Sequence, residues 1–366
     1  MNRYKVMTVL GTRPDAIKLA PVIKELDRRR TFSTVHVNSG QHDELLRPLI
    51  SLFRLRIDHQ VFLRRRIRTP DELSDVIRRR LAPIIAAESP SLVLVHGDTS
   101  TAMGATAAAA QCRIPVAHVE AGLRSGDDSS PFPEELYRKH ISKLASYHFA
   151  PTVENRSNLL REGVPSGAVF VTGNTVVDSL REMLSVRKMS KAVRSLLHET
   201  RGMKRIVLTM HRRENLGRLA ETFKALQCFV REHKEVCLIF PVHLNPAVRR
   251  AAKVFAGCPR VACIPPMRYD DFVQLARKAW VIVTDSGGIQ EEASTLGKPV
   301  LLFRANTERP EALNSCVTLA GESPERLIRH LADVSTPAFA GDNPFGNGGS
   351  SATIADLLEA IAEKTT

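Results

Sequence analysis

Short apolar runs alternate with helical patterns along almost the whole chain, and most of these runs end in a polar or glycine-containing turn. Residues 4–10 lead into a helical stripe at 17–26, and the same order recurs after the runs at 92–96 and 205–209. Repetition of strand, turn and helix is typical of a parallel sheet covered by helices. The chain is therefore expected to be an α/β protein whose turns gather at the carboxyl edge of each sheet.

The alternation falls into two halves of similar size. Residues 184–203 are charged and lack a strand pattern. The chain has 366 residues, enough for two domains of about 150 to 200 residues each. We predict two doubly wound Rossmann-like domains facing a central cleft. The first comprises residues 1–180, completed by a C-terminal helix at 350–366, and the second comprises residues 181–349.

The charge balance raises the question of nucleic acid. The formal net charge is +13, and arginines cluster at 28–30, 64–66 and 78–80. The first and third runs lie on predicted helices, where a solvated face explains them, and aromatic residues make up only 5% of the chain. A basic cleft that attracts a small anionic substrate explains the charge equally well, so we do not expect nucleic acid as a partner.

Cysteine usage and hydropathy favour the cytoplasm. No stretch approaches the roughly 18 apolar residues of a membrane span, and the N-terminus enters a strand without an apolar signal region. The six cysteines lack C-x-x-C spacing, and most lie in or beside apolar runs, which is typical of reduced core residues. No membrane association is expected.

The stretch 280–296, WVIVTDSGGIQEEASTL, carries the clearest ligand signal. An apolar run ends in the turn DSGG, and a helix is predicted over 289–296. The two glycines let the backbone approach a ligand, and the N–H groups of a helix N-terminus favour a phosphate. Glu291 and Glu292, expected in the first helical turn, could accept hydrogen bonds from ribose hydroxyls. The same residue types also serve ordinary helix capping, so this stretch alone leaves both interpretations open.

Carboxylates follow two other predicted strands. Asp98 comes after the run at 92–96, Glu120 comes after the run at 115–119, and Glu134 opens the helix beyond the same long turn. Asp98 could equally be a helix cap. A cluster of such groups at one edge of a parallel sheet is nevertheless how acid–base chemistry is assembled.

Cations and polar groups lie at other strand ends. Arg13 and Lys18 lie near a helix start, where they oppose the helix dipole unless they hold a phosphate. His211, in HRREN, is interpreted as a phosphate ligand or an acid, although a lone histidine is usually packed or solvated. Asn245, in PVHLNP, and Arg309, in TERPEA, lie at equivalent strand ends and are further ligand candidates.

Several common catalytic motifs are missing. The sequence has no G-x-x-x-x-G-K-[ST] loop, no G-x-G-x-x-G fingerprint, no H-E-x-x-H and no G-x-S-x-G. Hydride transfer, ATP hydrolysis and serine chemistry are therefore disfavoured.

The motifs, taken in order, resemble the bacterial UDP-N-acetylglucosamine 2-epimerase family over nearly the whole chain. They are GTRPDAIKLAPV, VHGDTST, HVEAGLRSGD with PFPEE, HFAPT, VTGNTVVD, HRREN, PVHLNP, TDSGGIQEEA, GKPVL and TERPEA. The resemblance implies the fold of GT-B glycosyltransferases, a homodimer, a UDP-sugar substrate and no metal or redox cofactor. The implied reaction is the reversible conversion of UDP-GlcNAc to UDP-ManNAc for surface polysaccharide.

The resemblance also implies a mechanism and its residues. In the family, loss of the C2 proton and departure of UDP give 2-acetamidoglucal, and UDP returns after protonation of the other face of C2. The residues that match the catalytic positions are Asp98, Glu120, Glu134 and His211. Those that match UDP-binding positions are Arg13, Lys18, His211, Asn245, Ser286, Gly287, Gly288 and Glu292, with Arg309 near the diphosphate.

The sequence departs from the family pattern in four places. Asp15 replaces the usual Glu, Tyr137 stands where Asn follows PFPEE, and Asn347 stands where Asp is common. The segment 59–73, HQVFLRRRIRTPDEL, lacks the usual Asp-Leu-x-x-Met and Gln-x-Leu stretches. In many relatives that region, with a turn that matches Gln41 and His42, helps to bind a second UDP-GlcNAc as an activator.

Four functions remain open from the sequence. The first is the non-hydrolysing epimerase, and the second is a hydrolysing 2-epimerase that releases UDP and free ManNAc, with a related UDP-sugar as a variant of either. A GT-B glycosyltransferase is disfavoured by the carboxylate set. A non-enzymatic nucleotide-sugar or nucleic-acid binder is motivated only by the arginine runs.

Overall fold

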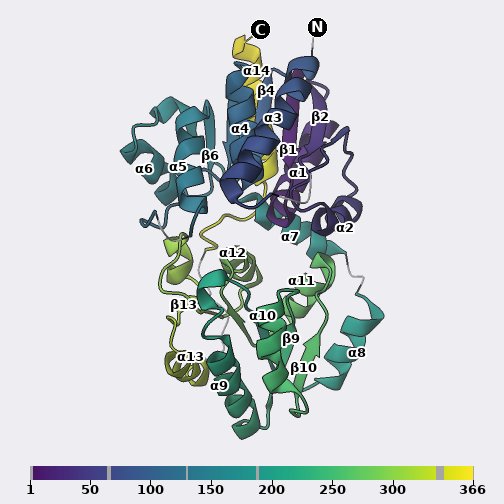
Figure 1. Ribbon diagram of the computed structural model, residues 1–366, viewed down its shortest axis with the longest axis vertical. Coiled ribbons are helices and arrows are strands. Elements are labelled where there is room, and N and C mark those ends of the chain that lie inside the picture. Colours follow the sequence, from purple (N-terminus) through teal and green to yellow (C-terminus); the bar gives the residue numbers. More distant parts are fainter. Residues whose placement is uncertain (1–2, 64–66, 129–130, 187–188, 335–341, 366) are drawn as a thin grey trace. The chain divides into compact units, whose positions relative to one another are not determined.

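The chain divides into two compact units in a computed structural model that describes residues 3–63, 67–128, 131–186, 189–334 and 342–365 (Figure 1). The first unit is Met1–Ser179 with Phe345–Thr366, and the second is Leu180–Pro344. The arginine run at 64–66 lies outside the described residues.

The first unit is built on a seven-stranded parallel sheet with the order β3-β2-β1-β4-β5-β6-β7 (Figure 1). Its strands are β1 (Tyr4–Leu10), β2 (Phe32–Asn38), β3 (His59–Gln60), β4 (Leu92–His96), β5 (Val116–Val119), β6 (Tyr147–Ala150) and β7 (Val169–Val171). Its helices are α1 (Arg13–Arg28), α2 (Asp43–Phe53), α3 (Pro70–Glu88), α4 (Ser100–Gln111), α5 (Glu134–Leu144), α6 (Val153–Arg161), η1 (Ser166–Ala168) and α14 (Ser350–Thr365), and α7 (Thr175–Ser185) crosses into the second unit.

The second unit is built on a six-stranded parallel sheet with the order β10-β9-β8-β11-β12-β13. Its strands are β8 (Lys204–Thr209), β9 (Val236–Pro241), β10 (Val261–Ile264), β11 (Val281–Thr284), β12 (Val300–Leu302) and β13 (Val317–Leu319). Its helices are α8 (Lys191–Glu199), η2 (Arg213–Asn215), α9 (Leu219–Glu232), α10 (Pro246–Ala251), η3 (Ala252–Phe255), α11 (Tyr269–Arg277), α12 (Gly287–Leu296), η4 (Pro310–Asn314) and α13 (Pro324–Ala332). The expected pair of doubly wound parallel sheets is thereby confirmed.

Small residues allow helix α4 to pack closely against the sheet and against α3. The side of α4 that carries Ala102, Ala105, Ala108 and Ala109 is buried in the core of the first unit. A Cβ at Gly104 would lie 2.6 Å from the carbonyl oxygen of Ser74, so only glycine fits at this helix contact. Close packing here fixes the start of α4, which lies at the carboxyl edge of the sheet.

The C-terminal helix α14 packs on the first unit. The guanidinium of Arg29, at the end of α1, lies 2.7 Å from carboxylate oxygens of both Asp356 and Glu359 on α14. At the start of α14, the carboxylate of Asp178 accepts hydrogen bonds from the backbone N–H groups of Gly349 and Ser351. The last helix of the chain therefore belongs to the same unit as the first strand.

Several element boundaries differ from the sequence prediction. Helix α12 begins at Gly287, two residues before the predicted start, because Ser286 takes the capping conformation. Glu291 and Glu292 consequently lie in the second helical turn, so their placement in the first turn was wrong. The helix predicted over 247–255 divides into α10 and a 3₁₀ segment, and helix α8 lies inside the charged stretch 184–203.

Two cysteines are not core residues. All six are free thiols; Cys237 and Cys258 are buried, whereas Cys228 and Cys263 are exposed. Cys228 lies on the exposed side of α9 and Cys263 on the edge strand β10, where an apolar run has one solvent-facing side. The expectation of a mainly buried cysteine set was therefore wrong for these two.

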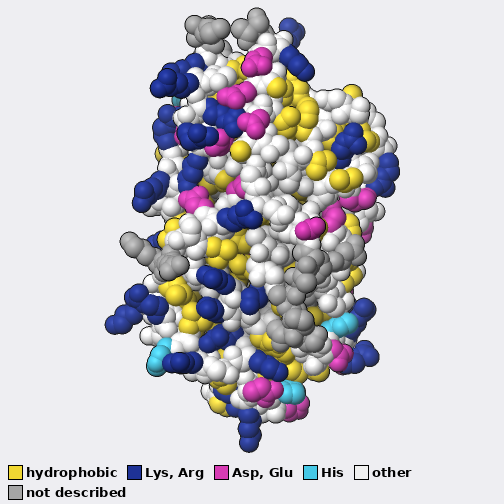
Figure 2. All heavy atoms as spheres, turned by 180° about the vertical axis from the view of Figure 1, so that it is seen from behind, with side chains coloured by type: hydrophobic (Ala, Val, Ile, Leu, Met, Phe, Trp, Pro, Cys, Tyr) yellow, Lys and Arg dark blue, Asp and Glu magenta, His cyan; other side chains and the backbone are white. Residues whose placement is uncertain are grey.

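Lys and Arg side chains are spread over the face shown in Figure 2, with acidic side chains among them. At the first arginine run, Arg28 and Arg29 both pair with Glu25 on the same helix. In the third run, Arg78 and Arg79 pair with Asp75 in the same way. Within the described ranges, no helix has the length and apolar character needed to cross a membrane.

Candidate active site

The turn after β1 is a capped helix start that places Lys18 inside the first unit. Thr12 caps α1 by accepting a hydrogen bond from the N–H of Asp15, whose carboxylate in turn accepts one from the N–H of Thr12. This capping box fixes the first turn of α1. Arg13 at its start is exposed, whereas Lys18, five residues later, is 4% exposed and forms an ion pair with Glu120.

Glu120 follows β5 directly and lies in a strained backbone conformation. Its φ of 64° is in the left-handed region, where a residue with a Cβ is uncommon. Its Oε2 atom is contacted by Lys18, by the side-chain amide of Asn174 at 3.1 Å and by the ring Nε2 of His96 at 3.6 Å. A strained, 9% exposed carboxylate held by several side chains is typical of a functional site.

Asp98 is held by a buried arginine and is not the helix cap. The cap of α4 is Thr99, which accepts a hydrogen bond from the N–H of Ala102. The carboxylate of Asp98 instead pairs with the guanidinium of Arg138 on α5. The second alternative for Asp98, a helix cap, is therefore wrong.

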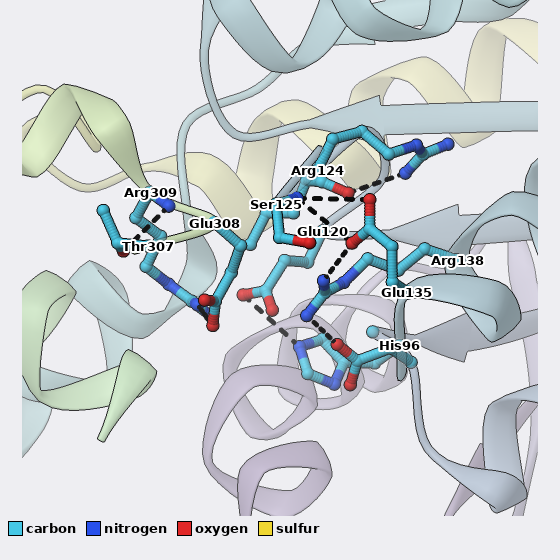
Figure 3. A network of polar contacts seen from close by, with 12 residues as sticks. His96, Glu120, Arg124, Ser125, Glu135, Arg138, Thr307, Glu308 and Arg309 are labelled. Atoms are coloured by element: carbon cyan, nitrogen blue, oxygen red, sulfur yellow. Dashed lines mark hydrogen bonds and ion pairs between the residues drawn. The ribbon is translucent and has the colours of Figure 1, made fainter. Parts of the chain in front are cut away.

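Arg138 is itself fixed by a fully buried carboxylate (Figure 3). Its Nη1 atom donates to Glu135 Oε2 at 2.7 Å, and Glu135 also accepts the backbone N–H of Ser125 at 3.1 Å. Arg138 and Glu135 lie three residues apart on α5. One turn of this helix therefore supplies both the arginine that holds Asp98 and the carboxylate that holds the arginine. The adjacent Glu134 is the first residue of α5 and is half-buried.

Two buried histidines on neighbouring strands have pKa values shifted in opposite directions. Burial disfavours the charged ring of His96, but the carboxylates of Glu120 and Asp15 outweigh it and raise its pKa to about 9. Burial and the neighbouring His148 lower the pKa of His118 to about 3, and its Nε2 atom lies 2.7 Å from the carbonyl oxygen of Gly97. His96 is thus favoured as an imidazolium and His118 as a neutral ring.

Gln41 and His42 lie in the turn between β2 and α2. The side-chain oxygen of Gln41 accepts hydrogen bonds from the backbone N–H of Thr101 at 2.9 Å and from its hydroxyl at 2.7 Å. This amide therefore links the turn to the first residues of α4. His42 is the residue before α2 and its side chain makes no capping hydrogen bond there.

Tyr137 joins α5 to the start of α3. Its hydroxyl donates a 2.8 Å hydrogen bond to Asp71, in the first turn of α3. Burial and this carboxylate raise the pKa of Tyr137 above its usual range. The tyrosine that departs from the family pattern thus contacts the 59–73 segment, which departs as well.

In the second unit, the N-terminus of α12 is open to a ligand. Ser286 precedes the helix and its side chain forms no capping hydrogen bond. A Cβ at Gly288 would meet nothing within 4 Å. The start of this ten-residue helix, whose first N–H groups have no partner within the helix, therefore has open space beside Gly288, an arrangement that favours an anion.

Gly287 serves a different purpose from Gly288. A Cβ at Gly287 would lie 2.6 Å from both Arg309 Nη1 and Glu308 Oε1. Arg309 is 6% exposed and pairs with both Glu308 and Glu291. The absence of a side chain at Gly287 thus makes room for this ion-pair cluster under the helix start.

A buried aspartate attaches the HRREN turn to the same helix start. Asp285, fully buried, accepts hydrogen bonds from the backbone N–H groups of His211 and Arg212 and from the side-chain amide of Asn215. The ring of His211 is exposed and stacks on His243, with ring centroids 4.9 Å apart. His211 is therefore held beside the Ser286 turn, as its strand-end position suggested.

Several of the predicted residues lie close together within each unit. Lys18 and Glu120 are in contact in the first unit, and Asp98 shares its sheet edge. His211, Ser286, the two glycines and Arg309 lie around the start of α12 in the second unit, and Glu292 lies in the second turn of that helix. Asn245 caps the short helix α10 by accepting from the N–H of Ala247.

Four side chains of the first-unit group were not predicted from the sequence. All four are deeply buried, and each contacts a predicted carboxylate or the partner of one. They are His96, Glu135, Arg138 and Asn174. His96 had a signal, as a histidine at the end of an otherwise apolar strand. Among the residues that the structure describes, no group of three His, Cys, Asp or Glu side chains has the arrangement of a metal site.

Comparisons with known proteins agree on one family. The model of the family described as UDP-N-acetylglucosamine 2-epimerase matches residues 24–359. The UDP-N-acetylglucosamine 2-epimerase of Escherichia coli strain K12 is 41% identical over 369 residues, which cover 97% of this chain and 98% of that protein.

Solved structures agree with the sequence matches. The MnaA protein of S. aureus, solved with UDP, aligns with a TM-score of 0.92 at 36% identity, covering 98% of this chain and 97% of the other. The UDP-GlcNAc 2-epimerase of Neisseria meningitidis, solved with UDP-GlcNAc bound, aligns with a TM-score of 0.91 at 38% identity, covering 97% and 99%.

Proposed function

The chain belongs to the UDP-N-acetylglucosamine 2-epimerase family, with a GT-B-like fold of two Rossmann-like units, and we propose that it interconverts UDP-GlcNAc and UDP-ManNAc without net hydrolysis. Membership of the family supports an epimerase activity. The non-hydrolysing outcome of the reaction and the roles of the individual residues are our proposal. The observation that supports them best is the strained carboxylate of Glu120, held at a sheet edge by Lys18, Asn174 and His96.

The second unit suits the leaving group. The N–H groups at the start of α12 and the side chain of His211 stabilise the two phosphates as the C1–O bond breaks and the electron pair passes to the diphosphate. Ser286, Gly287, Gly288 and Glu292 line this position, and Asn245 is the other proposed UDP contact of the second unit. In the first unit, Arg13 is a proposed UDP-binding residue. Arg309 acts from below the helix start, through its ion pairs.

The first unit suits the proton transfers. The C2 hydrogen is weakly acidic, so departure of UDP leads and a carboxylate takes the C2 proton as the C1=C2 double bond of 2-acetamidoglucal forms. A second acid then gives a proton to the opposite face of C2, and UDP returns to C1. Asp98, Glu120 and Glu134 are the proposed acids and bases, and Lys18 keeps Glu120 ionised.

Product analysis tests this proposal against its closest alternative. The protein is incubated with UDP-GlcNAc, and nucleotide sugars are separated from free sugars by anion exchange. We expect UDP-ManNAc to accumulate to a constant ratio with UDP-GlcNAc, without net release of UDP. Steady release of UDP with free ManNAc would instead establish a hydrolysing 2-epimerase.

We also propose a homodimer that acts in the cytoplasm and is regulated differently from relatives with an activator site. Gln41 makes its hydrogen bonds to Thr101, and the 59–73 segment departs from the family pattern. Light scattering measures the mass of the particle in solution, which should be that of two chains. A plot of the initial rate against the UDP-GlcNAc concentration should be hyperbolic. A sigmoidal plot would instead indicate that UDP-GlcNAc also binds as an activator, and it would contradict this proposal on regulation.

A further inference from the structure

His96 lies between two carboxylates in the interior of the first unit. Its Nδ1 atom is 3.0 Å from Asp15 Oδ1. Its Nε2 atom is 3.6 Å from Glu120 Oε2, and Figure 3 shows these two side chains. The ring is 3% exposed. A carboxylate can only accept a hydrogen bond, so Asp15 fixes a proton on Nδ1 and turns Nε2 toward Glu120.

Asp15 is held more firmly than an ordinary partner of a histidine. Its Oδ2 atom accepts the backbone N–H groups of Gly11 at 3.1 Å and Thr12 at 2.9 Å, while Oδ1 faces the ring. The side chain is 1% exposed. Because the first turn of α1 fixes this carboxylate, the orientation of His96 is fixed by the backbone.

The charged groups around the ring come from each neighbouring element. Asp15 contacts it from α1, and Glu120, which also pairs with Lys18 of α1, contacts it from the end of β5. The neutral His118 lies on β5, the neighbouring strand. His42, before α2, lies within electrostatic range of Asp15. With the ring protonated, an imidazolium lies between the two carboxylates, in addition to the Lys18 ammonium that pairs with Glu120.

We propose that His96 is a positioning residue for the reaction, an imidazolium fixed by Asp15 that holds the Glu120 carboxylate in place and in its ionised form. The proposal rests on the proposed function, because it assigns Glu120 to proton transfer. A buried carboxylate without a nearby cation tends to take up a proton, which would remove its ability to act as a base. His96 supplies this second cation beside Lys18.

Two neutral substitutions separate charge from shape. His96→Gln retains an amide in reach of Glu120, and His96→Asn retains a donor toward Asp15, but neither carries a charge. We expect kcat/KM at pH 6 to fall about tenfold in both, and the acid limb of the pH profile to move upward by about one pH unit. His96→Gln should recover most of the rate above pH 8.

His148→Asn is the matched control, since His148 is a buried histidine on β6 with 1% exposure. Its acid limb should coincide with that of the unmodified protein. UDP binding by calorimetry and the melting temperature should confirm that the His96 variants are folded. An acid limb unchanged in both His96 variants would overturn the proposal.

A spectroscopic readout tests the proposal without any variant. In the protein labelled with ¹⁵N-histidine, we expect one histidine to keep both ring nitrogens protonated at pH 8, and this signal should be absent from His96→Gln. A set of histidines that are all neutral at pH 8 would overturn the proposal. If the unmodified protein did not epimerise UDP-GlcNAc, the proposed function would fail while this signal still reported the Asp15–His96–Glu120 arrangement.

Discussion

Gly287 and Gly288 are adjacent in the first turn of α12 and should respond oppositely to the same added methyl group. In Gly287→Ala the Cβ would meet Arg309 Nη1 and Glu308 Oε1 at 2.6 Å each, so the buried ion pair has to move. Overpacking of this kind costs about 1 to 3 kcal/mol. In Gly288→Ala the Cβ meets nothing within 4 Å, and the better helix propensity of alanine contributes about 0.5 to 1 kcal/mol of stability.

Because the gain in helix propensity applies to both positions, the two variants should differ by the overpacking cost alone, about 1 to 3 kcal/mol, which corresponds to roughly 2 to 12 °C in the melting temperature of a domain of this size. Trp280 is the single tryptophan of the chain and packs against the core of the second unit, so its fluorescence follows the unfolding of that unit. The measurement is made without UDP, because both glycines lie in the proposed phosphate site. Melting temperatures of the two variants within about 1 °C of each other would refute the packing argument.

Three further predictions concern the first unit. Glu120→Gln should retain UDP binding in calorimetry but lose turnover; unchanged turnover would remove Glu120 from the catalytic set. Burial lowers the pKa of His148 to about 4, so between pH 6.5 and 4 the unfolded chain binds a proton that the folded ring does not. Stability should fall by about 2 kcal/mol across this window in urea titrations, and less so in His148→Asn; equal losses would contradict the assignment. Tyr137→Phe removes the hydrogen bond to Asp71 and should cost about 1 kcal/mol in the same titrations, whereas no change would mean that the bond contributes nothing.

The fold was predictable from the sequence because its strands are strongly patterned. The run at 92–96 is apolar except for His96 and is buried throughout, and a capped helix follows such a run in each unit, α4 after β4 and α10 after β9. Boundaries were less predictable where a short element is stabilised by tertiary contacts. Helix α8 is an example: Ser190, its cap, donates its N–H to Asp271, which lies 81 residues away in the sequence.

The candidate-site residues at strand ends were predictable from the sequence. The buried residues that hold them in place were not. Asp98, Glu120 and His211 lie within two residues of a strand end, so the parallel topology brings each of them to a sheet edge. Arg138 and Glu135 lie within helix α5, where charged residues usually face solvent, and only packing shows that both are buried. The purpose of Gly287 was hidden for the same reason, because the side chains that need its space lie about 20 residues further along the chain.

The most direct test of the account is proton NMR of the protein with UDP-GlcNAc in deuterated water. Elimination and re-addition require the C2 proton to leave the sugar, so we predict that deuterium enters C2 while the anomeric signal of UDP-ManNAc appears. The recovered UDP-GlcNAc should carry deuterium at C2 as well. Formation of UDP-ManNAc with the original proton retained at C2, or no new nucleotide sugar at all, would contradict the account.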